Sequence, residues 1–332
     1  MKNATIISTV QHSTSCSEIS AIIPSIPQDI DKLIRNTEFF FRYLPIKNIY
    51  VIGPETIAER VRNENNSRLI FINENEFVDV PRIRELYSSR TDKAPKHAGW
   101  YIQQFVKMQF ARFTNDEYYF IWDSDTIPLK PVNMFTDDGR PFFDMKTPHH
   151  PPYFDTIKKL LQGVSKVTAK SFISEHMLIK SEYMRDMLDE IEANNAVDGS
   201  NFQQKIINAV NPRDLSESGF SEFETYGNYV SVRHPESYVR RKWNSLRTKK
   251  RFFRDASAIN ASQREWLSKR YSTISVEKWQ MDTALSCLVE SDTFRKIFSP
   301  FMLEFLDGPL KTIIPEAIRP FLKHIYFRLT RR

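Results

Sequence analysis

Two carboxylates separated by one residue, Asp123 and Asp125, directly follow a run of large apolar side chains at residues 118–122. In an extended chain, residues i and i+2 point to the same face, so both carboxylates can share one ion. Mg²⁺ and Mn²⁺ prefer carboxylate oxygen and are commonly held by one or two carboxylates plus substrate phosphates. The alternative is a strand-end turn in which Asp caps backbone N–H groups. The pattern favours a Mn²⁺ or Mg²⁺ site that a bound diphosphate completes.

The segments before this pair alternate between strand and helix patterns. Short apolar runs with Pro or Gly stops predict strands at residues 19–24, 47–54, 67–77 and 117–122. Apolar residues at helical spacing predict helices at residues 29–44 and 97–113. This alternation is typical of a mainly parallel sheet, whose ligands bind beyond the carboxyl ends of the strands. Both carboxylates lie at such an end.

The second half of the chain has mixed signals. The patterns predict a proline-rich surface loop at residues 146–155, a strand at 173–180, a helix at 181–194 and further helices from 275 to 332. No internal repeat or low-complexity linker separates these segments.

Composition narrows the class of protein. The 332 residues are 41% hydrophobic, which is enough for a large core, and the net charge of +6 favours acidic partners. The two cysteines, Cys16 and Cys287, exclude a disulfide framework and a cysteine-based zinc site. No apolar stretch is long enough for a signal peptide or a membrane span, so we expect a cytoplasmic protein.

The sequence resembles GT-A fold glycosyltransferases in two segments, FIWDSDTIPL at residues 120–129 and GWYIQQFVKMQFA at residues 99–111. Similar segments occur in bacterial surface-polysaccharide glycosyltransferase-like proteins of unknown function. The resemblance implies an α/β GT-A (Rossmann-like) fold, with a mainly parallel sheet flanked by helices. It also implies that Asp123 meets the sugar or ribose and that Asp125 is the main metal ligand.

By the same resemblance, residues 1–240 form a nucleotide-sugar-binding and catalytic domain, and residues 241–332 form a basic, mainly helical C-terminal extension. The first strand supplies the contacts to base and ribose through Pro24 and Ser25. Four further polar residues flank the donor side and are expected to reach phosphate or base: Arg90, Lys96, Gln103 and Lys107. The sequence contains no G-x-G-x-x-G motif and no P-loop.

Inverting enzymes of this group need a base for the acceptor proton, from an acidic motif downstream of D-x-D. The stretch at residues 219–230 is similar in position and offers Glu222 and Glu224, of which Glu222 is preferred; solvated surface glutamates are the alternative. The resemblance also implies a late His as a further metal ligand. His234 is the best placed, although a lone His is more often a loop or core residue.

Glu175 and His176 lie in an apolar strand pattern, where a charge without a partner is costly. They either line an acceptor site or are buried with partners.

A rival reading uses the same carboxylates. Haloacid-dehalogenase-type phosphatases also have an apolar strand ending in D-x-D, with the first Asp as nucleophile. Their motif continues to a Thr, whereas Ile127 stands at that position, and about 120 residues precede the motif. Asp123 would be the nucleophile of such an enzyme.

Residues 233–254 form a basic stretch with interleaved aromatic side chains, and residues 315–332 form a basic, amphipathic tail. Both patterns favour an anionic membrane surface, with a solvated basic face as the alternative. Nucleic acid is a less favoured partner because no recognised motif accompanies the charge.

We therefore expect a glycosyltransferase with a nucleotide-sugar donor and a glycan or lipid-linked acceptor, acting in cell-surface polysaccharide or lipopolysaccharide synthesis. It would be cytoplasmic or peripheral on the inner face of the cytoplasmic membrane. A phosphatase, and a non-catalytic protein that binds membranes or nucleic acid, are the alternatives.

Overall fold

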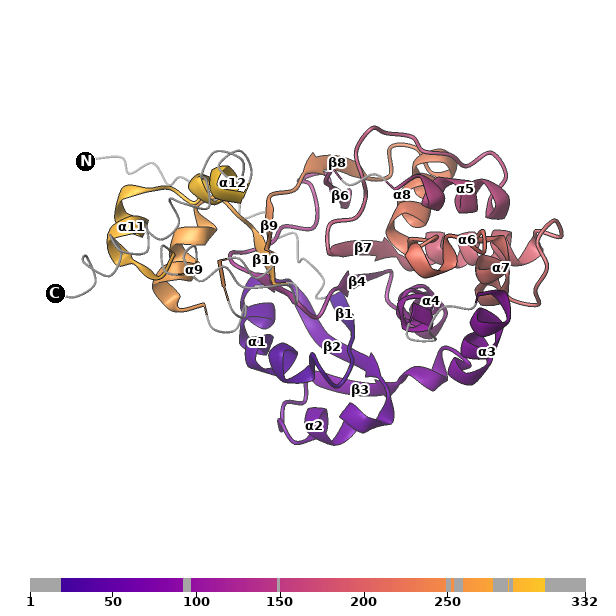
Figure 1. Ribbon diagram of the computed structural model, residues 1–332, viewed down its shortest axis with the longest axis horizontal. Helices are drawn as coiled ribbons and strands as arrows, with labels where there is room; N and C mark the ends of the chain where they lie inside the picture. Colours follow the sequence, from indigo (N-terminus) through magenta and orange to yellow (C-terminus); the bar gives the residue numbers. More distant parts are fainter. Residues whose placement is uncertain are drawn as a thin grey trace, which may run out of the picture.

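The computed structural model describes residues 19–91, 97–147, 150–248, 252–253, 259–276, 286 and 289–307. Five strands form its main sheet: β1 (Ile19–Pro24), β2 (Ile46–Gly53), β3 (Leu69–Asn73), β4 (Tyr118–Trp122) and β7 (His176–Lys180). Their order is β3-β2-β1-β4-β7 (Figure 1). The first four run in parallel and β7 is antiparallel to β4. The prediction of an α/β fold with a mainly parallel sheet is confirmed.

Helices cover both faces of this sheet (Figure 1). The helices of the first half are α1 (Ile30–Tyr43), α2 (Ala58–Arg62), α3 (Val80–Arg90) and α4 (Ala98–Phe113). Tyr119 and Ile121 of β4 pack in one core with Phe105 of α4, whereas Phe120 and Trp122 pack in a second core with α1. Burial on both faces explains why β4 is apolar without interruption.

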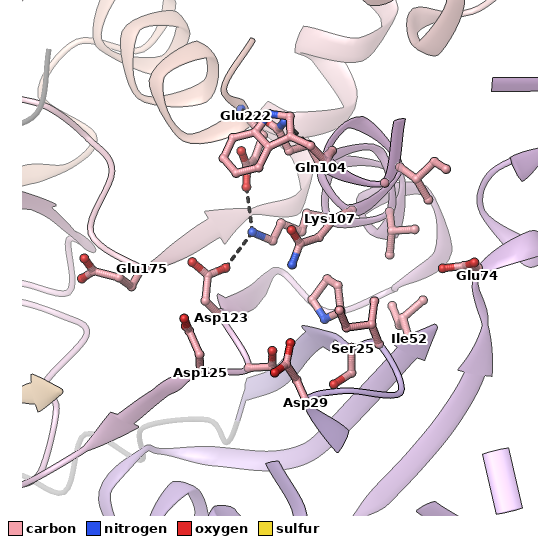
Figure 2. A pocket seen from close by; sticks show the side chains of 18 of the residues that line it. Ser25, Asp29, Ile52, Glu74, Gln104, Lys107, Asp123, Asp125, Glu175 and Glu222 are labelled. Carbon is pink, nitrogen blue, oxygen red and sulfur yellow. Dashed lines mark hydrogen bonds and ion pairs between the residues drawn. The ribbon is translucent and has the colours of Figure 1, made fainter. Parts of the chain in front are cut away.

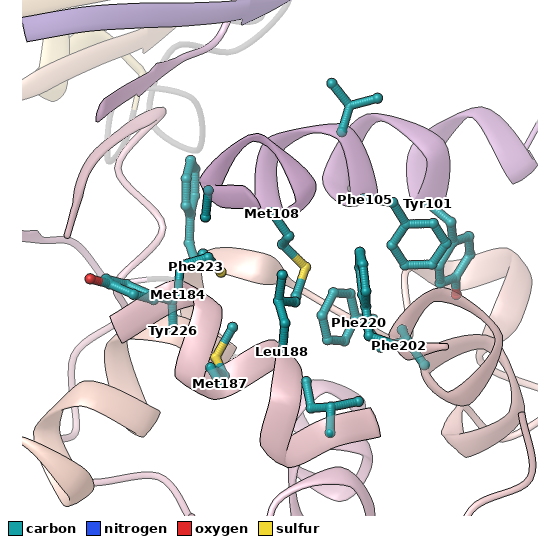
Figure 3. Close-up of a cluster of buried hydrophobic side chains, with 14 of the residues drawn as sticks. Tyr101, Phe105, Met108, Met184, Met187, Leu188, Phe202, Phe220, Phe223 and Tyr226 are labelled. Atoms are coloured by element: carbon teal, nitrogen blue, oxygen red, sulfur yellow. The ribbon is translucent and has the colours of Figure 1, made fainter. Parts of the chain in front are cut away.

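A layer of helices packs beyond α4, and its members are α5 (Pro151–Leu160), α6 (Ser181–Ala193), α7 (Phe202–Ala209) and α8 (Glu222–Arg233). Figure 3 shows Met108 of α4 among side chains of α6 and α8, including Leu188 and Tyr226. At Gly227 of α8, a Cβ would lie 2.3 Å from the ring of Phe172. Glycine therefore allows the helix to pack this closely.

Two small sheets join the two halves of the chain. They contain β5 (Thr126–Pro128), β9 (Ser245–Thr248) and β10 (Thr273–Val276) in the order β5-β10-β9, and β6 (Phe142–Met145) paired with β8 (Val239–Lys242). Beyond them lie α9 (Ala261–Ser268), α11 (Asp292–Ile297) and α12 (Phe301–Asp307). The predicted boundary after residue 240 falls inside β8, and the described part of the extension contains strands as well as helices.

The local predictions are mostly confirmed, including the strand and helix within residues 173–194. The predicted surface loop at residues 146–155 is wrong from Pro151 onward, because α5 begins there with two prolines in its first turn. Proline is well suited to that position, where its missing N–H has no helical partner. Within the described part of the chain, no helix has the length and apolarity needed to cross a membrane.

Candidate active site

A cleft of about 880 Å³ opens at the carboxyl ends of three strands of the main sheet (Figure 2). Pro24 ends β1, Ile52 is near the end of β2, and Asp123 follows β4; all three line the cleft. This is the edge at which ligands of parallel α/β sheets bind.

The turn that carries the carboxylate pair is fixed from both sides. The N–H of Asp123 donates to the carbonyl of Glu175 at 3.0 Å, and the N–H of Thr126 donates to the carbonyl of Asp123 at 3.1 Å. On the far side, the hydroxyls of Thr126 and Ser275 lie 2.6 Å apart. Asp123 and Asp125 both line the cleft from this turn.

A buried ammonium joins two carboxylates at the centre of the cleft. Figure 2 shows Lys107 Nζ between Asp123 Oδ1, at 2.8 Å, and Glu222 Oε1, at 2.9 Å. The side chain of Lys107 is only 4% exposed. Burial lowers the pKa of Lys107, but the two carboxylates more than offset this and raise the pKa above its usual range. Lys107 is therefore a permanent cation that orients both acids.

The position of Glu222 follows from how α8 begins. Ser221 is the N-cap, and its hydroxyl accepts from the N–H of Glu224 at 3.3 Å. The N–H of Glu222 donates to Gln104 Oε1 of α4 at 3.0 Å. Two bonds from α4 thus hold the first residue of α8, one from the Gln104 amide and one from the Lys107 ammonium.

Glu175 lies at the edge of the cleft in a left-handed backbone conformation, with φ of 67°. Lys146 Nζ donates to its Oε1 at 2.5 Å, and the Ser245 hydroxyl donates to its Oε2 at 3.1 Å. Non-glycine residues in this conformation carry strain of about 1–3 kcal/mol and cluster at functional sites. Glu175 is thus buried with partners, which is one of the two predicted alternatives, and it also lines the cleft.

The residues present fit a divalent cation in part. Asp123 and Asp125 supply hard oxygen ligands from one turn, and the bond from Lys107 uses only one oxygen of Asp123. Among the described residues, no three His, Cys, Asp or Glu side chains are grouped closely enough to hold a metal. Such a pair suits Mg²⁺ or Mn²⁺ that takes its remaining ligands from phosphate and water.

The structure brings most of the predicted site residues together. The following predicted residues line the one cleft: Pro24, Ser25, Gln103, Lys107, Asp123, Asp125, Glu175 and Glu222.

Two predicted residues at α8, His234 and Glu224, lie outside the cleft. His234 caps the far end of α8, where its ring stacks on Tyr183 with centroids 3.7 Å apart, so it is not placed to complete a shell with the carboxylate pair. Glu224 is buried and accepts from Ser171 Oγ at 2.6 Å and from Asn228. A helix turns by about 100° per residue, so Glu224 points away from the face that carries Glu222.

Arg90 and His176 also lie outside the cleft. Arg90 donates to the backbone carbonyl of Asn208 at 3.0 Å and so connects α3 to α7. His176 is 2% exposed and pairs with Asp144 at 2.9 Å. Its prediction as an acceptor-side residue is therefore corrected: the side chain is buried with a partner. Lys96 lies outside the described residues.

Arg247 is a cleft residue that no motif in the sequence indicates. Arg247 lies in register with Ser275, which in turn pairs with Thr126, and it lines the cleft beside the carboxylate turn. In the sequence it is one of many cations in a basic stretch, and only the pairing of β9, β10 and β5 places it here.

Comparisons with known proteins give a family and distant structural likenesses. Residues 18–299 match DUF6492, described as a family of unknown function. No curated protein matches the chain. Mouse xyloside xylosyltransferase 1 is 10% identical, with a TM-score of 0.41 over 70% of this chain and 87% of that one.

Two further solved structures are similar at the same level. The galactosyltransferase LgtC, in complex with donor and acceptor sugar analogs, is 10% identical, with a TM-score of 0.39 over 91% of this chain and 99% of that one. The bifunctional glycosyltransferase WbbM is 11% identical, with a TM-score of 0.41 over 90% of this chain and 52% of that one. At such scores and identities, these likenesses determine neither the activity nor the ligands of this chain.

Proposed function

The chain belongs to the DUF6492 family of unknown function, and we propose that it is a metal-dependent glycosyltransferase that uses a nucleotide-sugar donor. One observation carries the proposal. A single cleft joins Asp123 and Asp125, at the end of the central strand, to Glu222 on α8 through the buried ammonium of Lys107. Its volume of about 880 Å³ lies within the range of about 300–1,000 Å³ typical of small-molecule sites.

Sugar transfer breaks the bond between the anomeric carbon and the diphosphate oxygen, which leaves with the electron pair. The acceptor oxygen bonds to the same carbon and loses its proton. A divalent cation held by Asp123 and Asp125 would neutralise charge on the diphosphate. Lys107 fixes the orientation of the Asp123 carboxylate for a sugar or ribose hydroxyl. Glu222 is the proposed base for the acceptor proton.

The other end of the cleft suits the nucleoside. Pro24, Ser25 and Ile52 provide backbone and apolar surface at the ends of β1 and β2, and Asp29 and Gln103 add polar groups. Nucleosides combine a flat apolar base with ribose hydroxyls, which is the chemistry that such a lining accepts.

In this proposal the acceptor is a glycan or a lipid-linked glycan in the assembly of cell-surface polysaccharide or lipopolysaccharide. The enzyme would work at the inner face of the cytoplasmic membrane, with its net charge of +6 attracting anionic lipid. Arg240 and Lys242 of the basic stretch are exposed, which supports this role. Arg241 is bound to Asp144 at 2.5 Å and serves the fold instead. The basic tail at residues 315–332 lies outside the described residues.

The test is a screen of nucleotide sugars for Mn²⁺-dependent hydrolysis by the purified protein, because slow donor hydrolysis needs no acceptor. At least one donor is expected to be hydrolysed, and Asp125→Ala should remove both the hydrolysis and the Mn²⁺-dependent nucleotide affinity. The variant should keep its unfolding free energy, because it loses one of several anions that crowd the cleft. Unchanged nucleotide affinity in Asp125→Ala would remove this residue from the metal site.

The alternatives give different results in the same preparation. A phosphatase would form a covalent acyl phosphate on Asp123, which mass spectrometry detects after incubation with a phosphate monoester. A non-catalytic binding protein would show no calorimetric binding of nucleotide or metal.

A further inference from the structure

A second cavity, the basic pocket, has a volume of about 400 Å³ and is lined by residues of β8, β9 and α12, among others. Six cationic side chains line it: Lys146, Lys170, Arg240, Arg241, Lys242 and Arg270. The lining contains a single carboxylate, that of Glu304. Positive charge therefore exceeds negative charge in the lining, which favours an anion.

The basic pocket shares a wall with the catalytic cleft. Lys146 and Ser245 line the pocket, and both bind the carboxylate of Glu175, which lines the cleft. The backbone carbonyl of Glu175 in turn accepts from the N–H of Asp123 at 3.0 Å. The carboxylate of Glu175 thus lies between the turn at Asp123 and the cations of the pocket.

Half of the cations in the pocket are already neutralised. Lys146 pairs with Glu175, Arg241 with Asp144, and Arg270 with Glu304. The other three, Lys170, Arg240 and Lys242, are exposed and form no salt bridge with any residue that the structure describes. Like charges that line one cavity repel one another, and a bound anion would relieve this repulsion.

We infer that the basic pocket binds a phosphate group of the acceptor. This inference rests on the proposed function and specifies its acceptor, a saccharide that carries phosphate close to the hydroxyl that receives the new sugar. Besides the cations, the pocket offers the amide of the exposed Asn244 as a hydrogen-bond donor. Phosphate provides three acceptor oxygens for such donors.

The phosphate has two possible sources, a soluble sugar phosphate or the headgroup of a membrane lipid carrier. The experiment uses one probe for each. Glucose 1-phosphate is titrated by calorimetry, with glucose as the uncharged control. Phosphatidylglycerol vesicles are tested by co-sedimentation, with phosphatidylcholine vesicles as the uncharged control.

Three variants locate the binding. Lys170→Gln, Arg240→Gln and Lys242→Gln are combined in one triple variant that empties the pocket of its unpaired cations. The matched control combines Arg42→Gln, Lys158→Gln and Arg213→Gln, which removes the same charge from exposed positions elsewhere. Asp125→Ala reports whether the probe sits in the catalytic cleft instead.

At least one phosphate probe should bind the wild type, and the triple variant should bind it about tenfold more weakly or worse, because charge-assisted bonds are lost. The matched control and Asp125→Ala should bind it as the wild type does. The inference is overturned if neither probe binds, if both triple variants lose affinity equally, or if Asp125→Ala alone loses it. Donor hydrolysis by the wild type is measured separately, so an absent hydrolysis overturns the proposed function and leaves the phosphate result standing.

Discussion

Two buried ionic clusters in the described part of the chain have similar chemistry and differ in their access to a cavity. In the first, Lys107 joins Asp123 and Glu222 beside a cleft of about 880 Å³. In the second, Asp144 joins His176 and Arg241 beside a space of only 10 Å³. A space that small holds at most about one water molecule. The first cluster can therefore meet a ligand, whereas Asp144 and His176 of the second cluster are enclosed and support the fold.

Aromatic rings and hydrogen bonds surround Asp144 and His176 in the second cluster. The ring of His176 stacks on Trp122 with centroids 5.1 Å apart and meets Trp243 edge-on at 4.6 Å. Burial raises the pKa of Asp144, but the hydrogen bonds from His176 and Arg241 outweigh it and hold the pKa below its usual range. The two clusters contain similar ionisable groups, so it is the open cleft beside Lys107 that allows the first cluster to bind a ligand.

The largest expected effect is that of Lys107→Met in the open cluster. Removing the cation leaves Asp123 and the buried Glu222 facing each other, and breaking a buried ion pair in this way costs about 3–5 kcal/mol of unfolding free energy. Urea unfolding at pH 7 measures the loss.

Lys47→Met is the matched control, because the half-exposed pair of Lys47 with Asp116, at 2.7 Å, contributes about 1 kcal/mol or less. Equal losses in the two variants would show that Lys107 is not the centre of a buried cluster.

The second effect is kinetic. Glu222→Gln keeps an oxygen that accepts from Lys107 but cannot take a proton, so donor hydrolysis should fall by about 10²–10⁴-fold while nucleotide affinity stays unchanged. Calorimetry and hydrolysis rates, taken on the same preparation, separate the two quantities. A fall of less than about tenfold would assign the base to another group.

A smaller effect is expected in the sealed cluster. Asp144→Asn should lower the unfolding free energy at pH 7 by about 1.5–3 kcal/mol, the value of hydrogen bonds to a charged group. Nucleotide affinity per folded molecule should not change, because no ligand reaches this carboxylate. A changed nucleotide affinity with an unchanged unfolding free energy would show that a ligand does reach the Asp144 carboxylate.

The effect of Asp144→Asn on the unfolding free energy should also depend on pH. The folded pKa of Asp144 is depressed, so its stabilisation is present above the unfolded value of about 3.9 and is lost as pH falls through the folded pKa. The difference in unfolding free energy between wild type and Asp144→Asn should therefore shrink between pH 6 and pH 3.

The smallest effect is that of Glu224→Gln. Burial raises the pKa of Glu224, so its ionised form lowers stability at neutral pH, and the amide removes that cost. The amide also retains an oxygen for the Ser171 hydroxyl. Stability should change by about 1 kcal/mol or less, and donor hydrolysis should be unaffected. A large loss of hydrolysis would make Glu224 the base in place of Glu222.

The sequence predicts the part of the site that one continuous segment builds. The apolar run before Asp123, the helix before that run and the strand-end position of the pair all follow from local pattern, and the structure has each of them. Local pattern also placed Ser25 at the end of the first strand, where it lines the cleft.

The clusters themselves were not predictable in this way. Lys107 meets Glu222 across 115 residues of sequence, and Arg241 meets Asp144 only because β8 pairs with β6. No periodicity encodes such contacts. The same limit explains His234, since its chemistry suits a metal but the length of α8 carries it away from the carboxylates.

The pairing of β10 with β5 has a consequence for the order in which the protein is made. Thr126, next to the carboxylate pair, bonds to Ser275, which leaves the ribosome 149 residues later. Chains fold from the N-terminus as they emerge, at about 5–20 residues per second. The main sheet therefore forms several seconds before Ser275 can bond to Thr126. During that interval the turn at Asp125 lacks the contact with β10.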